Sequence, residues 1–316
     1  MKISFIVIGK NEGFKLVKSI KGIFSFCETN DLRSFEVIYV DSCSVDGSAE
    51  AVMAMSEQVR VLRLKGTTNA AIGRNAGAMV ASGQVFFFID GDMELNPAFH
   101  IKELSTPDQN ILVSGQIENI IYDENYTSVI KREFYYKGLD NDRVERYFGG
   151  LFVISRNLWE KAKGMRTEFR YGEDLDLSVR LGAMGYFLKR SSAVLAFHHT
   201  VIKPIGFGNV MSNAAYSRGL LYRRHLQNPA ILHRILRSDP TMPVLVLCIL
   251  SFILFHQLFF ICSYFLVLCT AIIIKYRFSK NFFTAVLLQF VRDVAVIGAM
   301  LFFWPKPQST GYDILA

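Results

Sequence analysis

Short runs of apolar residues, separated by polar and glycine-containing segments, recur through the first two hundred positions of the chain. The run at 85–89 is wholly apolar, which is typical of a strand buried on both faces of a parallel sheet. Segments that suit helices lie between several of these runs. The expected strands are residues 3–8, 35–40, 59–64, 85–89 and 192–197. Strands that alternate with helices at this spacing predict an α/β domain with a mostly parallel sheet.

Two acidic residues follow the strand at 85–89 directly, in the sequence Asp90-Gly91-Asp92. Ligands of open α/β sheets bind at the carboxyl ends of the strands, where both side chains are expected. Two carboxylates this close repel each other unless a cation lies between them. A Mg²⁺ or Mn²⁺ ion, itself held to a substrate phosphate, meets this demand. A β-turn with two solvated aspartates is the simpler alternative.

Other polar residues also stand at expected strand ends or helix starts. Asn11 and Glu12 follow the first strand, and Asp41 ends the second. Asp41 can accept hydrogen bonds from a base or a ribose, or it can cap its own loop. Asp46 is expected to cap the helix that follows it. Arg74 lies near a helix start that faces the strand ends, which is a natural place for a diphosphate contact.

The order of these motifs is similar to that of family 2 glycosyltransferases, which have the GT-A fold. The resemblance covers residues 1–201, and it rests on the segments 11–12, 40–48, 73–77 and 90–92. It implies a GT-A domain that binds a nucleotide sugar. In that family the loop after the first strand and the aspartate ending the second hold the nucleotide, and the Asp-x-Asp pair holds the metal on its diphosphate. Ile8 departs from the family, which often has Pro there.

A second acidic segment begins at Glu173-Asp174, at the mouth of a short expected helix. The helix dipole favours carboxylates there, so capping alone can explain them. The segment also resembles the catalytic acidic motif of the family, which implies that Asp174, with Glu173 beside it, supplies the general base. Such a base deprotonates an acceptor hydroxyl as it attacks the anomeric carbon, while the nucleotide diphosphate leaves from the opposite side. Asp176 and Arg180 are expected to form a structural pair.

Two further pairs complete the candidate site. Gly149 and Gly150 precede an expected strand and would let backbone approach a bound sugar, or simply form a turn. His198 and His199 end the strand at 192–197, near the point where GT-A enzymes often have a metal- or diphosphate-binding histidine. Neighbouring strand residues face opposite sides, so one of the two, with His198 favoured, is expected to reach the metal. The alternative is that both are merely hydrogen-bonded.

The chain changes character after about residue 210. Hydrophobic residues make up 51% of the sequence, which is high for a soluble protein, and the net charge of +7 lies entirely in residues 202–316. Basic residues beside apolar ones predict amphipathic helices over 211–242 on an anionic membrane surface, and no nucleic-acid partner. The uncharged run at 243–274 would be ~48 Å long as one helix, against a ~30 Å hydrocarbon core. A pair of short spans that turns near His256-Gln257 therefore fits better.

The residues thus predict a catalytic domain over 1–210, juxtamembrane helices over 211–242, about three apolar transmembrane segments over 243–304 and a tail over 305–316. Arg292 and Asp293 lie within the third segment. Arg292 is expected either to face the phosphate of a lipid-linked acceptor or only to orient its helix. The five cysteines form no CxxC pair, which fits a reducing compartment.

The predicted function is metal-dependent, inverting transfer from a nucleotide-diphosphate sugar to a hydroxyl of a lipid-linked glycan. The resemblance extends to exopolysaccharide- and succinoglycan-type enzymes, which places the protein in the inner (plasma) membrane as a multi-pass protein with a cytoplasmic catalytic domain. A polyprenyl-phosphate sugar synthase is one alternative, although its phosphate acceptor needs no base. A non-catalytic membrane scaffold is the other, and it has no need for acidic residues at several strand and helix ends.

Overall fold

The computed structural model describes residues 1–316 except 102–109, 203–207, 209–210, 212–213, 277–281 and 316. The chain divides into two compact units. Unit 1 comprises Met1–Pro204 together with Pro307–Ala316, and unit 2 comprises Ile205–Lys306. The expected boundary at 210/211 therefore shifts by a few residues, to a place outside the described residues. The tail expected to be separate belongs to unit 1.

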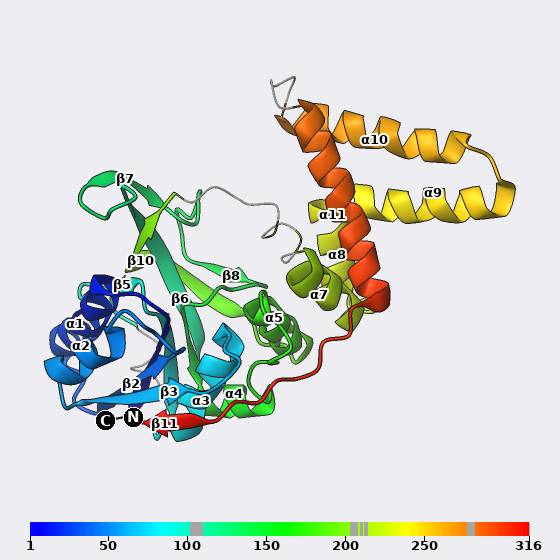
Figure 1. Cartoon of the computed structure of the whole chain (residues 1–316). Helices are drawn as coiled ribbons and strands as arrows, with labels where there is room; N and C mark the ends of the chain where they lie inside the picture. The colour runs from blue at the N-terminus through cyan, green and yellow to red at the C-terminus, as the bar shows by residue number, and fades with distance from the viewer. Residues whose placement is uncertain (102–109, 203–207, 209–210, 212–213, 277–281, 316) are drawn as a thin grey trace. The chain divides into compact units, whose positions relative to one another are not determined.

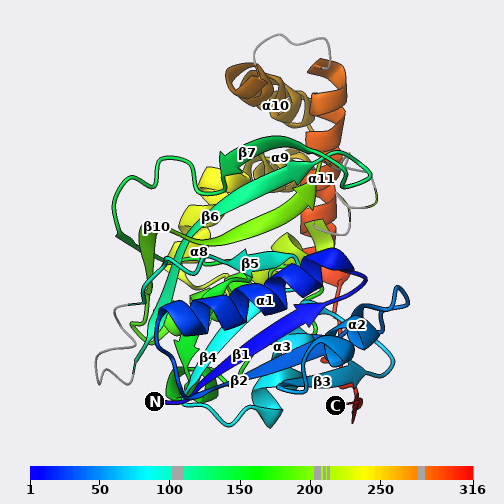
Figure 2. The same cartoon turned by 90° about the vertical axis from the view of Figure 1, so that its left-hand side faces the viewer.

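Unit 1 is built around one mixed sheet (Figures 1 and 2). The strand order is β11-β3-β2-β1-β4-β9-β6-β10-β5, with β7 on β6 and β8 on β10. The strands are β1 (Ile3–Gly9), β2 (Phe35–Asp41), β3 (Val59–Leu64), β4 (Val85–Asp90), β5 (Met93–Leu95), β6 (Leu112–Tyr122), β7 (Val129–Phe134), β8 (Arg143–Glu145), β9 (Phe152–Ser155), β10 (Leu188–Val201) and β11 (Tyr312–Ile314).

The expectation of a mostly parallel sheet holds for only part of this sheet. Strands β3, β2, β1 and β4 run parallel, as does the pair β6 and β10. Strand β9 is antiparallel to both β4 and β6, and β5 is antiparallel to β10. The irregular region after residue 97 supplies β6, β7, β8 and β9. The sequence of β7 shows no alternation of apolar and polar residues, because this strand is almost wholly exposed. Strand β10 pairs irregularly with β6 between Arg190 and Ala196, which interrupts its own alternation.

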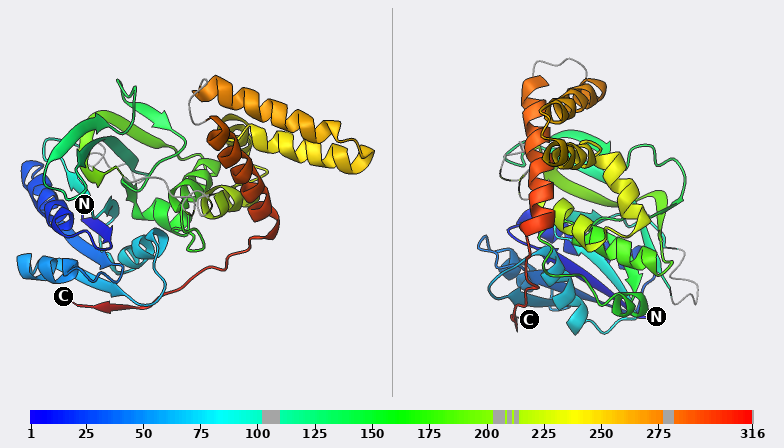
Figure 3. Two further views of the ribbon diagram at one scale, coloured as in Figure 1. Left: turned by 45° about the horizontal axis from the view of Figure 1, so that its top comes forward. Right: turned by 90° about the vertical axis from the view of Figure 1, so that its right-hand side faces the viewer.

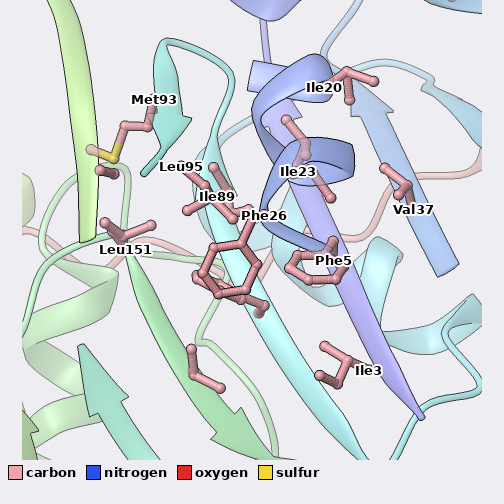
Figure 4. Packing of buried hydrophobic residues seen from close by; sticks show 14 of the residues in the cluster. Ile3, Phe5, Ile20, Ile23, Phe26, Val37, Ile89, Met93, Leu95 and Leu151 are labelled. Carbon is pink, nitrogen blue, oxygen red and sulfur yellow. The ribbon is translucent and has the colours of Figure 1, made fainter. Parts of the chain in front are cut away.

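Helices cover both faces of the sheet. They are α1 (Phe14–Thr29), α2 (Ser48–Met55), α3 (Ala70–Val80), α4 (Arg156–Lys161) and α5 (Glu173–Ala183). The apolar run of β4 supplies both cores, because successive side chains of a strand face opposite sides. Phe87 packs into the core under α1, where its ring stacks on Phe5 at 5.2 Å, whereas Phe88 packs on Trp159 of α4 at 4.6 Å. Figure 4 shows the first of these cores, in which Phe26 of α1 lies over the strands.

The packing of α3 fixes the position of the residues it carries. The side chain of Asn69 accepts a hydrogen bond from the backbone N–H of Ile72 and so begins the helix. At Gly77 a side chain would overlap Ile6 of β1, so the glycine lets α3 lie close to the sheet. The first turns of α3 consequently stand beside the carboxyl ends of β1 and β4, which is the edge where the acidic residues gather.

Unit 2 is helical. It contains a π-helical turn, η2 (Ala214–Gly219), followed by α7 (Leu220–Arg224), α8 (Pro229–Ser238), α9 (Thr241–Phe255), α10 (Phe259–Tyr276) and α11 (Phe282–Phe302). Helices α9 and α10 form a hairpin that turns at residues 256–258, where a turn was expected. Figure 3 shows the two helices side by side and α11 crossing them near their open end.

The expectation of about three transmembrane segments is not supported. Within the described residues only α11 is by itself long and apolar enough to cross a membrane. Helices α8 and α9 pass the same test only when taken together, and they are bent by 92° at their junction. Helix α9 has 15 residues, and α10 carries its apolar residues over Phe259–Ile274. The turn at 256–258 divides the apolar run, and neither α9 nor α10 alone passes the test for a spanning helix.

Candidate active site

A cleft of about 550 Å³ opens at the carboxyl ends of β1 and β4. Its walls come from the loops after these strands, from the start of α3, from the glycines before β9 and from the start of α5. The sequence-predicted residues that line it are Glu12, Arg74, Asp90, Asp92, Gly149, Gly150, Glu173, Asp174 and His198. Three predicted residues, Asn11, Asp41 and His199, are not part of its lining. Most of the candidate site therefore lies together.

Arg74 is the buried centre of this cleft. Its side chain is only 2% exposed, and its two terminal nitrogens are both bound by carboxylates. The Nη1 atom donates to Glu173 Oε1 at 2.8 Å, and Nη2 donates to Asp90 Oδ1 at 2.6 Å. Arg74 thus forms two ion pairs within the protein, and its contact with a diphosphate stays a prediction. The guanidinium therefore pairs with one carboxylate from the predicted metal-binding motif and one from the predicted catalytic motif.

Gly150 is required by this ion-pair cluster. A Cβ atom at position 150 would clash with Arg74 Nη2 and would lie 2.5 Å from Asp90 Oδ2. At the neighbouring Gly149 a Cβ atom would make only ordinary contacts, 3.7 Å from Tyr136 Oη and 3.9 Å from Asp174 Oδ2. The glycine pair was expected to admit a sugar. Gly150 instead admits the Arg74–Asp90 pair, while Gly149 leaves open the space beside Asp174.

Asp92 and His198 form the second feature of the cleft. His198 Nε2 lies 3.3 Å from Asp92 Oδ2, and its Nδ1 lies 2.9 Å from Asn119 Oδ1. Asn119 can only accept through that oxygen, so Nδ1 carries the proton and Nε2 faces Asp92. Burial alone would lower the pKa of His198, but Asp92 raises it above its usual value. A ring held through Nδ1 in this way is oriented as metal-binding imidazoles usually are.

His199 faces the other side of β10 and is not placed to bind a metal in the cleft. Its ring is 1% exposed, Nε2 lies 2.8 Å from Glu94 Oε2, and Nδ1 lies 2.9 Å from Tyr122 Oη. The alternation of side chains along a strand separates the two histidines. Of the pair, His198 alone lines the cleft.

The residues fit a divalent cation that shares its coordination with a substrate. No group of three His, Cys, Asp or Glu side chains in the described part of the chain could hold a metal alone. Mg²⁺ and Mn²⁺ sites of nucleotide enzymes use one or two protein ligands, with phosphate oxygens and water completing the shell. Asp92 and His198 meet that requirement. Burial and the charges of Asp92 and Asp90 raise the pKa of the nearby Glu12, although Lys15 opposes the rise. Lys15 lies 2.5 Å from Glu12 and partly balances the acidic side chains of this corner.

Asp174 lines the same cleft from the first turn of α5. Its Oδ1 atom accepts a hydrogen bond from the backbone N–H of Leu175 at 2.7 Å. Burial and the neighbouring Glu173 charge raise the pKa of Asp174 to about 7, even though Arg74 lowers it. A carboxyl group with such a pKa can take up and release a proton near neutral pH. Glu173 also lines the cleft, but it is buried and bound to Arg74, so it holds the ion-pair cluster together. Its predicted part in catalysis stays a prediction.

The remaining acids have structural partners. Asp176 is buried, and it bonds Arg180 at 2.7 Å and Arg166 at 3.0 Å, which agrees with the expected structural pair. Asp46 is not the capping residue itself, because Gly47 occupies that position. The Asp46 carboxylate instead accepts from the backbone N–H of Ser48 and of Gly13, and so ties two loops together.

The expected nucleotide-binding residues are also held by the protein. Asp41 is fully buried, and it accepts hydrogen bonds from Tyr39, from the backbone of Ser44 and from Arg63. Asn11 accepts from the backbone N–H of Val45 and has a positive φ of 56°. Both residues shape the loops at the mouth of the cleft. Their direct contact with a nucleotide stays a prediction.

The sequence matches the family described as Glycosyl transferase family 2 over residues 4–163, which is about half of the chain. The chain belongs to glycosyltransferase family 2. This match includes Asp90 and Asp92, but it ends before Glu173 and Asp174. A comparison with curated proteins gave no match.

Solved glycosyltransferases share the fold of this one. TarS residues 1–349 from S. aureus give a TM-score of 0.57 at 13% identity, covering 95% of this chain and 90% of that one. The same fragment in complex with UDP-GlcNAc gives 0.54 at 13% identity, covering 95% and 91%. The mannosyltransferase PcManGT from Pyrobaculum calidifontis, in complex with GDP-Man and Mn²⁺, gives 0.56 at 17% identity, covering 95% and 87%. At these identities the likeness establishes the GT-A fold.

Three side chains around the cleft of this glycosyltransferase were not among the predicted site residues, although they belong to a region that lines the acceptor site in the resembled family. Asn119 orients His198, and Tyr135 and Tyr136 form part of the lining. They lie in a region where amides and aromatic residues show no clear period. A possible signal was the pair of adjacent tyrosines shortly before a Gly-Gly pair, but it indicates neither a strand nor a partner.

Proposed function

We propose that this glycosyltransferase moves a sugar, with inversion, from a nucleotide-diphosphate sugar to a hydroxyl group of a lipid-linked glycan, aided by Mg²⁺ or Mn²⁺. The observation that carries the proposal is the placement of Asp174. Its carboxyl group lines the same cleft as Asp92 and His198, and its pKa is raised to about 7. A base matched to neutral pH, opposite a cation-binding corner, suits attack by a hydroxyl group on an activated sugar.

Each residue has a separate task in this mechanism. Asp92 and His198 would hold the cation, which neutralises charge on the departing diphosphate when it is bound. Asp174 accepts the proton of the acceptor hydroxyl as its oxygen attacks the anomeric carbon. Arg74 keeps Asp90 and Glu173 in place, so that the two sides of the cleft hold a fixed separation. Fixed charges that need not reorganise during the reaction are a main source of enzymatic rate enhancement.

The acceptor is assigned to the lipid-linked class because of unit 2. Apolar side chains on its helices are widely exposed, among them Leu250, Leu254 and Phe259, at 51, 72 and 72%. Such side chains suit the hydrocarbon of a bilayer better than water. Basic residues of α7 and α8, including Arg224 and Arg237, suit the anionic headgroups beside it. We assign unit 2 as the membrane anchor of the catalytic domain.

The first step in testing this function is to identify the nucleotide-sugar donor. Purified protein is screened against nucleotide sugars in Mn²⁺ for thermal stabilisation. A ligand at ~100 times its dissociation constant adds ~2.7 kcal/mol to the free energy of unfolding. The stabilising donor is then incubated with membrane glycolipid fractions and, separately, with polyprenyl phosphate.

Transfer to a glycolipid hydroxyl with an inverted anomeric centre supports the proposal. Transfer to polyprenyl phosphate, unaffected by Asp174→Asn, would instead establish the alternative synthase activity. If no nucleotide sugar stabilises the protein or is turned over, the proposed function is wrong.

A further inference from the structure

The segment after unit 2 returns to the catalytic sheet. Strand β11 pairs antiparallel with the edge strand β3, with Tyr312 opposite Leu64 and Ile314 opposite Leu62. Backbone hydrogen bonds extend the pairing at both ends, from Lys65 N–H to Gly311 at 2.8 Å and from Leu315 N–H to Val61 at 2.8 Å. Lys65 Nζ lies 2.5 Å from Asp313 Oδ1. The residues before and after unit 2 therefore belong to one folded domain.

This pairing limits the path of the chain through a bilayer. Residues 1–204 and 307–316 form one unit, so both must lie on the same side of the membrane. The segment between them then crosses an even number of times or not at all. Three crossings are excluded, and so is a single crossing by α11. This reasoning rests on the proposed membrane association of unit 2.

The length of α9 argues against a crossing by the hairpin. Helix α9, with 15 residues, is about 22 Å long, and a hydrocarbon core is about 30 Å thick. A hairpin of this length that enters from one side ends inside the bilayer. The residues at its closed end support this position. Phe255, Leu258 and Phe259 are 63, 71 and 72% exposed, and no residue between 243 and 274 carries a formal charge.

Helix α11 lies at the open end of the hairpin, away from its tip (Figures 1 and 3). The polar residues in its middle meet the start of α9. Gln289 Nε2 donates to Thr241 Oγ1 at 3.1 Å, and Arg292 Nε lies 3.8 Å from Asp239 Oδ1. Asp239 immediately precedes α9 and also binds Arg218. The middle of α11 is thus level with the base of the hairpin, so the expected lipid-phosphate contact of Arg292 is replaced by protein partners.

Charges stand near both ends of α11. Lys275, Arg277 and Lys280 precede it in the sequence, and Lys306 follows it. At its C-terminal end, Arg223 of α7 donates to the carbonyl oxygen of Phe303, and its guanidinium lies 3.8 Å from the centre of the Trp304 ring. Basic residues are retained on the cytoplasmic side of membranes. Because basic residues flank both ends of α11, both ends are expected on the cytoplasmic side, and the helix is then expected to lie along that surface of the membrane.

We propose that unit 2 is inserted into the membrane from one side only. The α9–α10 hairpin enters the hydrocarbon and returns to the side of the catalytic domain, while α11 lies along the interface and does not cross. The partner of the exposed apolar surface of the hairpin is therefore the interior of the bilayer.

The test uses single cysteines in the full-length chain. Cys27, Cys43, Cys248, Cys262 and Cys269 are first replaced by serine. One cysteine is then added at Gln257 in the hairpin turn, at Ser309 in the tail or at Glu57 in the catalytic domain. Sealed vesicles of either orientation are treated with a membrane-impermeant maleimide. We expect Glu57→Cys and Ser309→Cys to be labelled only in inside-out vesicles, and Gln257→Cys to be labelled in neither until detergent is added.

Other results would overturn the proposal. Labelling of Gln257→Cys in right-side-out vesicles would show that the hairpin crosses, and labelling in inside-out vesicles would show that it is not inserted. Opposite labelling of Ser309→Cys and Glu57→Cys would give an odd number of crossings. A carbodiimide cross-link between Lys65 and Asp313 in membranes, absent in Asp313→Asn, checks the strand pairing itself. If carbonate washing releases the protein, the membrane association fails rather than the path of the chain alone.

Discussion

The Nη1 atom of Arg74 lies 2.8 Å from the Oε1 atom of Glu173, and both side chains are buried although 99 positions separate them. This contact links the first turns of α3 and α5. A second bond from Arg74 to Asp90 joins the same cluster to the end of β4. Because one buried cation holds two carboxylates, its loss would leave both without this partner, and Glu173 would be left in a poorly solvated place.

Arg74→Met is expected to lower the free energy of unfolding by about 3 kcal/mol, since breaking a buried ion pair costs more than the pair contributes. Urea denaturation measures the change. Arg33→Met is the matched control, because Arg33 forms an exposed pair with Asp31, and it should change stability by less than about 0.5 kcal/mol. Equal stability of the two variants would show that Arg74 does not stabilise the site.

Gly150→Ala should damage the cleft, whereas Gly149→Ala should be nearly silent in folding. An added methyl group at position 150 clashes with Arg74 Nη2, and overpacking of this kind costs about 1–3 kcal/mol. The methyl group at position 149 makes only ordinary contacts. Thermal melting of the two variants beside the unmodified protein measures the difference. Similar melting temperatures for both variants would contradict the role assigned to Gly150.

Asp174→Asn should reduce turnover by about 10²–10⁴-fold and leave donor affinity within a few fold. The amide keeps the shape of the side chain but cannot accept the proton. Donor binding is followed by thermal stabilisation and transfer by product formation. Asp140→Asn, an exposed carboxylate outside the cleft lining, serves as the control. If donor binding is lost together with turnover, Asp174 is a donor-site residue rather than the base.

The same residue predicts a pH profile. With a pKa of about 7, Asp174 is protonated at acidic pH, so kcat/KM should rise with pH and level off above about 7. The effect on stability has the opposite sign. The folded-state pKa lies above the ordinary value of 3.8, so the carboxyl group destabilises the fold increasingly as pH rises from about 4 through 7. Asp174→Asn should therefore gain stability relative to the unmodified protein at pH 8 but not at pH 4. A flat kcat/KM profile between pH 5 and 8 would remove Asp174 as the titrating base.

Asp92→Asn should abolish the additional thermal stabilisation that Mn²⁺ gives in the presence of donor. Asp31→Asn, an exposed aspartate whose side chain is 77% accessible, should retain it. His199→Gln tests the geometry of the neighbouring histidines, because His199 bonds Glu94 and Tyr122 instead of facing the cleft. That variant should keep metal-dependent donor binding even if it is less stable. Unchanged metal dependence in Asp92→Asn would mean that the cation binds elsewhere.

The sequence predicted those features that depend on the residue pattern of a single strand. The apolar run of β4 followed by Asp90 and Asp92 predicted both a buried strand and the edge of the cleft. The period of two along β10 predicted that only one of His198 and His199 faces that cleft. Such inferences need only local geometry, which the pattern of side chains contains.

Partners across the fold could not be predicted in this way. Arg74 was expected to contact a diphosphate because its position on a helix was known, while its contact with Glu173 depends on how α3 and α5 pack. Strand β11 has three residues and no apolar period, and it exists as a strand because β3 offers an unpaired edge. The mixed half of the sheet was likewise hidden, since β7 is exposed along nearly its whole length and lacks the alternation of a half-buried strand.

The pairing of β11 with β3 also has a consequence for biosynthesis. Residues 59–64 leave the ribosome long before residues 312–314, and the whole apolar unit is made between them. The outer edge of β3 therefore stays open until the helices of unit 2 have been synthesised. An open edge with unpaired backbone groups is a site at which another chain can add a strand. On the proposed topology, the pairing of β11 with β3 therefore completes the sheet only after unit 2 has been made and inserted.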